Sequence, residues 1–117
     1  MPTFKMEGCN VADVVVFNCK GWITAGEGAT TFHNTIRGLL DNGSKRLVLD
    51  VSNVTSVDST GVQTLVSTCS FFVNNGGELK LVGLDQHVQK LLHMTAQYGV
   101  LEPHLSPDVA SAIQAFN

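Results

Sequence analysis

The sequence predicts a mixed α/β domain, and three observations lead to this fold class. Segments with a helical spacing of apolar residues alternate with short apolar segments of strand type. Two extended segments precede this alternation, as is typical of an antiparallel hairpin. A chain of 117 residues is also long enough to bury one core without disulfides or a metal ion. We therefore expect a single domain over residues 1–117, with a mixed four- or five-stranded sheet, an N-terminal antiparallel hairpin and about four helices.

The first half of the chain supplies the hairpin, a helix and a central strand. Residues 4–9 alternate in polarity and residues 14–20 form a β-branched run, so a hairpin is expected around a turn at 10–13. A helix beginning near Gly28 should end in a left-handed residue at 42–43. Its apolar positions are Ala29, Phe32, Ile36, Leu39 and Leu40. Residues 46–51 are typical of a strand covered on both faces, and the helix before them predicts a parallel crossover.

The second half continues the alternation. A second helix begins near Ser59, a strand follows at 78–82, and a third helix runs from about 85 to 98 with Gly99 past its end. The order Ser106, Pro107, Asp108 predicts a last helix with Ser106 as its cap. The apolar faces of these three helices are Val62, Leu65, Val66, Cys69, Phe72 and Val73; Val88, Leu91 and Leu92; and Val109, Ala112, Ile113 and Phe116. The middle of the sheet should bury Leu47, Val48, Leu49, Leu79, Leu81 and Val82.

Charge and hydropathy exclude several functional classes. The net charge is -3, and Lys45 and Arg46 form the only adjacent basic pair, so a nucleic-acid-binding face is not expected. The longest apolar run, residues 14–17, is far too short to cross a membrane. The first three residues also lack the basic and apolar regions of a signal peptide. We expect a cytoplasmic protein.

Neither the cysteines nor the histidines have the spacing of metal ligands. Cys9, Cys19 and Cys69 are odd in number and never in C-x-x-C spacing, so we expect small buried side chains rather than disulfides. The four histidines lack the H-E-x-x-H spacing. They are His33, His87, His93 and His104. We predict no metal and no cofactor.

No catalytic template is present in the sequence. It contains neither the G-x-x-x-x-G-K-[ST] phosphate loop nor the G-x-S-x-G nucleophile elbow. The glycines at 26 and 28 precede a helix and could cradle an anion, but turn statistics favour a plain loop. These observations favour a binding module over an enzyme.

The most informative segment is residues 57–62, between a strand and a helix. In one interpretation, Asp58 or Ser59 caps the helix by accepting hydrogen bonds from free N–H groups. In the other, the hydroxyls of Ser59 and Thr60 lie at the positive end of the helix dipole, where a phosphate would be held favourably. Gly61 is a poor helix former, which indicates that something approaches the backbone closely there.

Helical geometry extends this segment into a surface. Thr60, Thr64, Ser67 and Phe71 share one stripe, opposite the apolar face of the second helix. A large apolar side chain in line with modifiable hydroxyls is typical of a partner-binding helix, although Phe71 can also fold over the helix edge. The residues alone leave both interpretations open.

Several segments in combination resemble the STAS family, which contains bacterial anti-sigma factor antagonists. The resemblance extends from about residue 4 onward, and the matching segments are 21–24, 26–28, 47–54, 57–62 and 76–82. In the family, a D-S-[ST]-G segment opens the second helix, and a partner kinase phosphorylates its second hydroxyl residue. The resemblance therefore implies phosphorylation at Thr60, with Ser59 as the second choice. Many phosphorylated antagonists carry G-x-[LIV]-D where this chain has residues 21–24, so Thr24 replaces a carboxylate.

The resemblance also implies a mechanism without catalysis by this chain. The unphosphorylated antagonist binds an anti-sigma factor that is itself an ATP-using serine/threonine kinase, so the sigma factor is released, and phosphorylation reverses the binding. The expected partner-binding residues are Thr24, Asp58, Ser59, Thr60, Thr64, Ser67 and Phe71. We expect a monomer or a weak dimer.

Two alternatives remain open. The first is a STAS domain without a sigma factor, in a stressosome-type scaffold or a lipid transport complex. The second is a small nucleotide-binding or phosphotransfer enzyme, which turnover of ATP or GTP by the purified chain would reveal.

Overall fold

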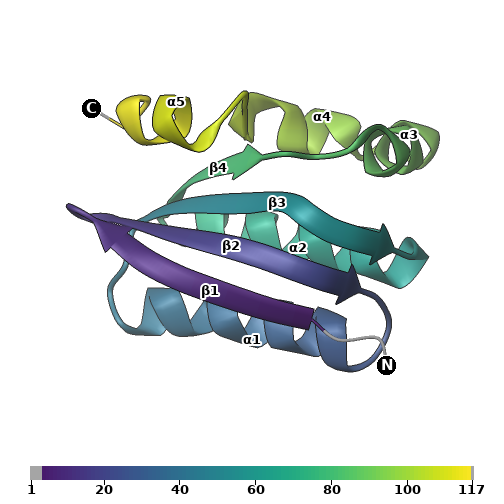
Figure 1. Ribbon diagram of the computed structural model, residues 1–117, viewed down its shortest axis with the longest axis horizontal. Coiled ribbons are helices and arrows are strands. Elements are labelled where there is room, and N and C mark those ends of the chain that lie inside the picture. Colours follow the sequence, from purple (N-terminus) through teal and green to yellow (C-terminus); the bar gives the residue numbers. More distant parts are fainter. Residues whose placement is uncertain (1–3, 117) are drawn as a thin grey trace.

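A five-stranded sheet organises residues 4–116, the part of the chain that the computed structural model describes (Figure 1). The elements are β1 (Phe4–Val11), β2 (Val14–Ile23), α1 (Glu27–Asp41), β3 (Arg46–Val57), α2 (Ser59–Asn74), β4 (Glu78–Val82), α3 (Gln86–Met94), α4 (Tyr98–Leu101), the 3-10 turn η1 (Glu102–His104), β5 (Leu105–Ser106) and α5 (Val109–Gln114). The strands lie side by side in chain order. β1 is antiparallel to β2 and all other pairs are parallel, which confirms the predicted mixed sheet with an N-terminal hairpin.

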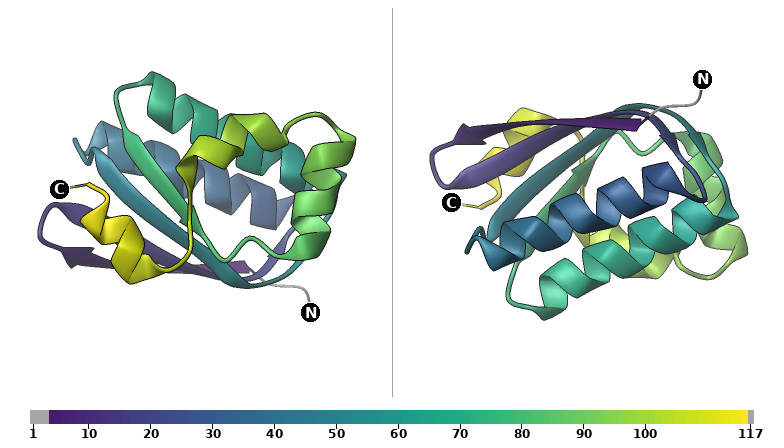
Figure 2. Two further views of the ribbon diagram at one scale, coloured as in Figure 1. Left: turned by 90° about the horizontal axis from the view of Figure 1, so that it is seen from above. Right: turned by 90° about the horizontal axis from the view of Figure 1, so that it is seen from below.

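The two faces of the sheet bury two separate clusters. Viewed from below, α1 and α2 lie side by side across one face (Figure 2). Leu47 and Leu49 of β3 point into this larger cluster, whereas Val48 between them packs with Phe116 and the side chains around α5. All six residues predicted for the middle of the sheet are buried, as the alternation of a strand covered on both faces requires.

The central strand is longer than its apolar run predicts. The sequence indicated an end at residue 51, but β3 continues to Val57 beside β2. Two irregularities in the register, each with an extra residue in β3, interrupt this pairing. As a result Val51, Val54 and Val57 face the same core although they are three residues apart. Strict alternation could not reveal this second half of the strand.

The hairpin is also longer and tighter than expected. β1 and β2 pair up to Val11 and Val14, so the turn consists of Ala12 and Asp13 alone. Ala12 takes the positive φ of 55° that such a short turn demands.

Two helix boundaries differ from the predictions: the end of the third helix and the start of the last helix. The third helix ends at Met94 rather than near 98, because Ala96 turns left-handed with a φ of 58° and Gln97 N–H donates to the Leu92 carbonyl. Gly99 therefore lies inside the separate short helix α4. The last helix is capped by Asp108, which accepts from Ser111 N–H, and not by Ser106, which lies in β5.

The first helix follows its prediction closely. It begins at Glu27 beside the expected Gly28, and Gly43 beyond it has the left-handed φ of 83° that the sequence indicated. Ser44 N–H donates to the Leu39 carbonyl across this end.

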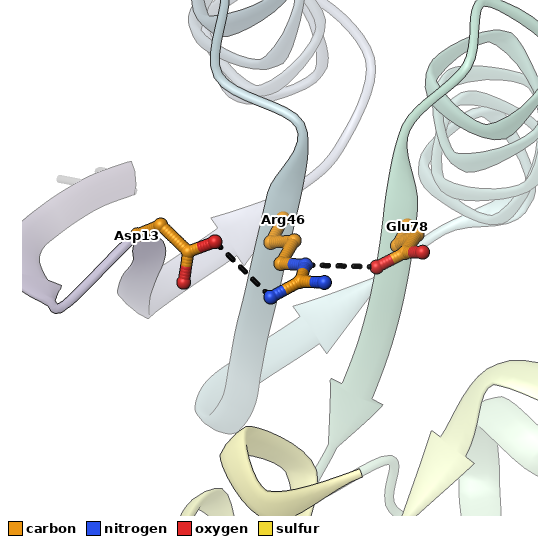
Figure 3. A network of polar contacts seen from close by, with 3 residues as sticks. All are labelled: Asp13, Arg46 and Glu78. Carbon is orange, nitrogen blue, oxygen red and sulfur yellow. Dashed lines mark hydrogen bonds and ion pairs between the residues drawn. The ribbon is translucent and has the colours of Figure 1, made fainter. Parts of the chain in front are cut away.

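Arg46 connects the hairpin turn and β4 to β3, at the end of the sheet where β3 and β4 begin (Figure 3). Its Nη1 lies 3.1 Å from a carboxylate oxygen of Asp13 in the hairpin turn, and its Nε lies 3.0 Å from Glu78 at the start of β4. The guanidinium also lies 6.0 Å from the ring centre of Phe116 beyond α5. This network connects the strand ends at the end of the sheet opposite residues 57–62.

Candidate functional site

The predicted site lies where β2 and β3 end and α1 and α2 begin. The two strands are parallel to each other and each is followed by one of these helices, so the two helix N-termini lie at the same end of the sheet (Figure 1). The segment around Asp58 and the segment around Thr24 are therefore neighbours in space, although more than thirty residues separate them in sequence.

Asp58 connects these two segments. It is the N-cap of α2, and its Oδ1 accepts a hydrogen bond of 2.7 Å from Gly61 N–H. Its other oxygen, Oδ2, accepts from Ala25 N–H in the β2–α1 loop at 3.1 Å. The Gly61 and Ala25 N–H groups hold the pKa of the Asp58 carboxyl below its usual range. Asp58 is thus the cap, and the alternative that Ser59 caps the helix is wrong.

Gly61 permits the close approach that its position in the first turn predicted. A Cβ at this position would overlap the carbonyl oxygen of Ile23 and come within 2.9 Å of Val57 Cγ1. In the same way, a Cβ on Gly28 in α1 would overlap the carbonyl oxygen of Trp22. The two helices therefore rest on successive peptide groups at the end of β2, which explains why glycine occupies both first turns. The interpretation of the 26–28 segment as a plain loop is wrong for Gly28, which is helical.

The hydroxyl-bearing residues Ser59 and Thr60 are exposed at the start of α2. They occupy the first two helical positions after the Asp58 cap, where backbone N–H groups have no partner one turn earlier in the helix. An anion on either hydroxyl would gain from the helix dipole but would lie beside the ionised carboxylate of Asp58. The arrangement can therefore accept a phosphoryl group at the surface, at an electrostatic cost to Asp58.

The predicted stripe along α2 is only partly solvent-facing. Ser67 is exposed and Thr64 is half-buried. Phe71 is half-buried too, because its ring packs toward α1, with its centre 5.9 Å from the Arg37 guanidinium carbon and 6.2 Å from the His33 ring. The expectation that Phe71 lies directly opposite the core face is therefore wrong, and the ring folds over the helix edge.

Thr24 lies at the same edge as Asp58 and is half-buried. Its carbonyl accepts a hydrogen bond of 3.1 Å from Ala29 N–H in the first turn of α1. The structure thus brings Thr24, Asp58, Ser59 and Thr60 together, while Thr64, Ser67 and Phe71 continue along α2 away from them.

Sequence reasoning missed two features of this region. One is the Ala25 N–H, which a sequence cannot mark because any residue except proline carries it. The other is Trp22, which lies two residues before Thr24 and exposes 42% of its surface. Exposed tryptophan side chains are enriched at protein interfaces, so Trp22 is a candidate contact residue. Its status as the sole tryptophan in the chain was the available signal.

The three cysteines differ in exposure. Cys19 and Cys69 are buried as expected, but Cys9 is exposed, because it lies on the open edge strand β1. Burial raises the pKa of the Cys69 thiol to about 12, and burial together with Asp50 raises that of Cys19 to about 12. Within residues 4–116, no three His, Cys, Asp or Glu side chains gather as metal ligands would.

Together, the fold and this edge define a class: an α/β domain that presents a helix N-terminus with exposed hydroxyl groups on its surface. The family model of the STAS domain matches residues 9–112. This match covers most of the chain, and the chain belongs to the STAS domain family. None of the helices between residues 4 and 116 is long and apolar enough to span a bilayer.

Solved structures share this fold. An anti-sigma factor antagonist from Mycobacterium paratuberculosis has a TM-score of 0.75 and 21% identity, covering 97% of this chain and 93% of that chain. The Bacillus cell fate determinant SpoIIAA in its phosphorylated form has a TM-score of 0.72 and 14% identity, covering 98% and 100%. The murine anion transporter Slc26a9 has a TM-score of 0.71 and 19% identity, covering 92% of this chain but 18% of that chain. Identities this low show a common fold alone, and no curated protein sequence matches significantly.

Proposed function

We propose that the chain is an anti-sigma factor antagonist regulated by phosphorylation of Thr60. In its unphosphorylated form it binds an anti-sigma factor that is a serine/threonine kinase, in the bacterial cytoplasm, and so frees the sigma factor for transcription. The observation that carries the proposal is the exposed Thr60 hydroxyl in the first turn of α2, beside the Asp58 cap. Two structures of the same fold support it: the anti-sigma factor antagonist from Mycobacterium paratuberculosis and the phosphorylated form of SpoIIAA.

The docking surface we propose is the edge around Asp58 and its continuation along α2. It comprises Thr24, Asp58, Ser59, Thr60, Thr64, Ser67 and Phe71. Before modification, Thr60 presents a neutral hydroxyl, which a partner can cover at little cost. A phosphate would place a charge of about -2 at the interface, where a buried, unpaired charge typically costs several kcal/mol.

The test is a titration of three proteins against the kinase that co-purifies with the chain, with and without ATP. Wild type should bind tightly and lose affinity when ATP is added. Thr60→Ala should stay bound with ATP because the acceptor hydroxyl is gone. Thr60→Glu should fold normally and bind weakly under both conditions, because an acidic side chain is favourable at a helix N-terminus but not in the interface.

Ser59→Ala is the matched control for this titration. Since Asp58 provides the cap, removing the neighbouring hydroxyl should leave both the melting temperature and the ATP response unchanged. Loss of phosphate incorporation in Ser59→Ala but not in Thr60→Ala would move the acceptor to Ser59.

Identical binding by wild type, Thr60→Ala and Thr60→Glu would contradict the phosphorylation mechanism. That result would favour a STAS domain that docks without a sigma factor, in a scaffold or a transport complex, and Thr24 in place of the family carboxylate would fit it. Turnover of ATP or GTP by the purified chain alone would instead contradict the proposal that it is not an enzyme.

A further inference from the structure

The Asp58 carboxylate makes a second contact that capping does not require. Its Oδ1 serves the helix by accepting from Gly61 N–H at 2.7 Å. Its Oδ2 leaves the helix and accepts from Ala25 N–H at 3.1 Å, across the edge of the sheet. One side chain therefore holds the β2–α1 loop against the start of α2.

The other two capping aspartates show that this second contact is particular to Asp58. Asp85 accepts from Val88 N–H at 2.8 Å, and Asp108 accepts from Ser111 N–H at 2.7 Å. Each of these bonds stays within the capped helix, three residues from its aspartate. Asp85 and Asp108 therefore serve as internal comparisons for a carboxylate that only caps.

The held loop is short, and its two ends are anchored differently. On its far side, Thr24 O accepts from Ala29 N–H and Gly26 O accepts from Thr30 N–H, which ties the loop to α1. Ala25 and Gly26 are exposed, and Gly26 takes a positive φ of 97°. The Asp58 bond is the hydrogen bond that joins this loop to α2.

A phosphate on Thr60 would act directly on that bond. Thr60 is the second residue of α2, and its side chain begins two residues from the Asp58 carboxylate. Two negative groups so close repel one another, and both draw on the same few N–H donors of the first helical turn. The Gly61 N–H can donate to the phosphate as well as to the Asp58 carboxylate. The Ala25 N–H lies in the β2–α1 loop and moves with that loop.

We propose that Asp58 is a latch that holds the β2–α1 loop, residues 24–26, on the N-terminus of α2, and that a phosphate on Thr60 opens this latch. The second half of the proposal rests on the proposed function. Modification then changes the shape of the docking surface as well as its charge, because Thr24 belongs to the released loop. Asp58 is a positioning residue in this mechanism.

The test is amide hydrogen exchange, resolved by residue, on four forms of the whole chain without any partner. Asp58→Asn keeps an oxygen that can cap Gly61, but its amide nitrogen is a donor and cannot accept from Ala25. It should speed exchange at Ala25 by at least about tenfold and leave Gly61 nearly unchanged. A chain with phosphothreonine encoded at position 60 should speed exchange at Ala25 to a similar degree.

Two matched variants control for general effects of charge and of capping. Ser67→Glu adds a negative charge two turns further along α2, and Asp108→Asn changes a cap that bonds to Ser111 within its own helix. Both should leave the Ala25 exchange rate as in wild type. An equal acceleration at Ala25 in either control would overturn the proposal.

The two halves of the proposal fail separately. Unchanged exchange at Ala25 in Asp58→Asn would overturn the latch. Acceleration in Asp58→Asn without acceleration in the phosphothreonine protein would overturn its opening by phosphate. Because the phosphothreonine is encoded, neither result depends on the kinase, whose failure to modify Thr60 would contradict the proposed function instead.

Discussion

Gly61 is the residue at which the site allows least freedom. A side chain there would overlap the Ile23 carbonyl oxygen, so Gly61→Ala must shift α2 or the end of β2. We expect the free energy of unfolding to fall by about 1–3 kcal/mol, measured by urea denaturation. Gly38→Ala in α1 is the control, because its Cβ would meet nothing within 4 Å, and it should gain about 0.5–1 kcal/mol. Equal effects in the two variants would contradict the packing argument.

The two buried thiols make stability fall at alkaline pH. Their pKa values rise from 9.0 to about 12 on folding, so only the unfolded chain ionises between these values. A raised folded pKa means that the stabilisation is fully present below pH 9 and is lost as the pH rises toward 12.

Cys69→Ala isolates this effect. Between pH 7.5 and 10.5 wild type should lose on the order of 1–2 kcal/mol more than the variant, because one pKa unit corresponds to about 1.4 kcal/mol. Urea denaturation at the two pH values measures the difference. All other side chains are the same in the two proteins, so their contributions to the difference cancel. Parallel losses in the two proteins would show that Cys69 is not protected by burial.

At the residue scale, sequence could predict that residues 57–62 contain a capped helix start, but not the hydrogen bonds that connect this segment to others. Asp58 and Ser59 are both good helix caps, and only the φ and ψ angles and the Gly61 bond assign the cap to Asp58. The bond to Ala25 joins residues 33 positions apart, and no local preference encodes it.

At the scale of elements, Phe71 contributes to the contact between α1 and α2. Phe71→Ala removes the ring from Arg37 and His33, so we expect a stability loss of about 1–2 kcal/mol. We also expect weaker kinase binding by about 1–3 kcal/mol, measured by titration. Ser67→Ala, on the same stripe but exposed, should leave stability unchanged. Loss of stability with unaltered binding would remove Phe71 from the docking surface.

Arg46 connects the strand ends at the opposite edge. The pair with Asp13 is partly exposed, so a double-mutant cycle with Asp13→Asn and Arg46→Gln should give a coupling of about 0.2–1 kcal/mol. Added salt should weaken this coupling because the pair is screened. A coupling that does not change with salt would contradict the assignment of this contact as a partly exposed, screened ion pair.

The ends of elements escaped prediction for identifiable reasons. The second half of β3 contains register shifts that place every third valine in the core, so neither a two-residue nor a helical period describes it. Both Ser106 and Asp108 are good capping residues for the last helix. Ser106 pairs with Val82 in the sheet, so Asp108 caps the helix instead.

On the scale of the whole molecule, the central strand supports both clusters. Leu49 is fully buried, so Leu49→Ala should lower the free energy of unfolding by about 2–5 kcal/mol, a large share of what a domain of this size has. Val11→Ala, at a position 43% exposed, should change it by less than about 0.5 kcal/mol. Chemical denaturation of both variants tests this, and similar losses would place the stabilising core elsewhere.

The global fold was the most predictable level. The apolar run of β3, the helical periods on either side and the opening hairpin each restrict the topology, and they agree with one another. These patterns could not predict contacts between loops, such as the bond from Ala25 N–H to Asp58. Such contacts form only when the strand ends come together in the folded sheet.

The order of the strands has a consequence for synthesis on the ribosome. Because neighbours in the sheet are also successive in the chain, each new strand finds its partner already made when it emerges. At about 5–20 residues per second, the 22 residues between Ile23 and Arg46 take a second or more to synthesise, so the hairpin has this time to form before β3 arrives to pair with β2. The sheet can therefore grow by adding strands on one side, without rearrangement. Among the strands of residues 4–116, β1 is made first, and no later strand pairs with its outer edge.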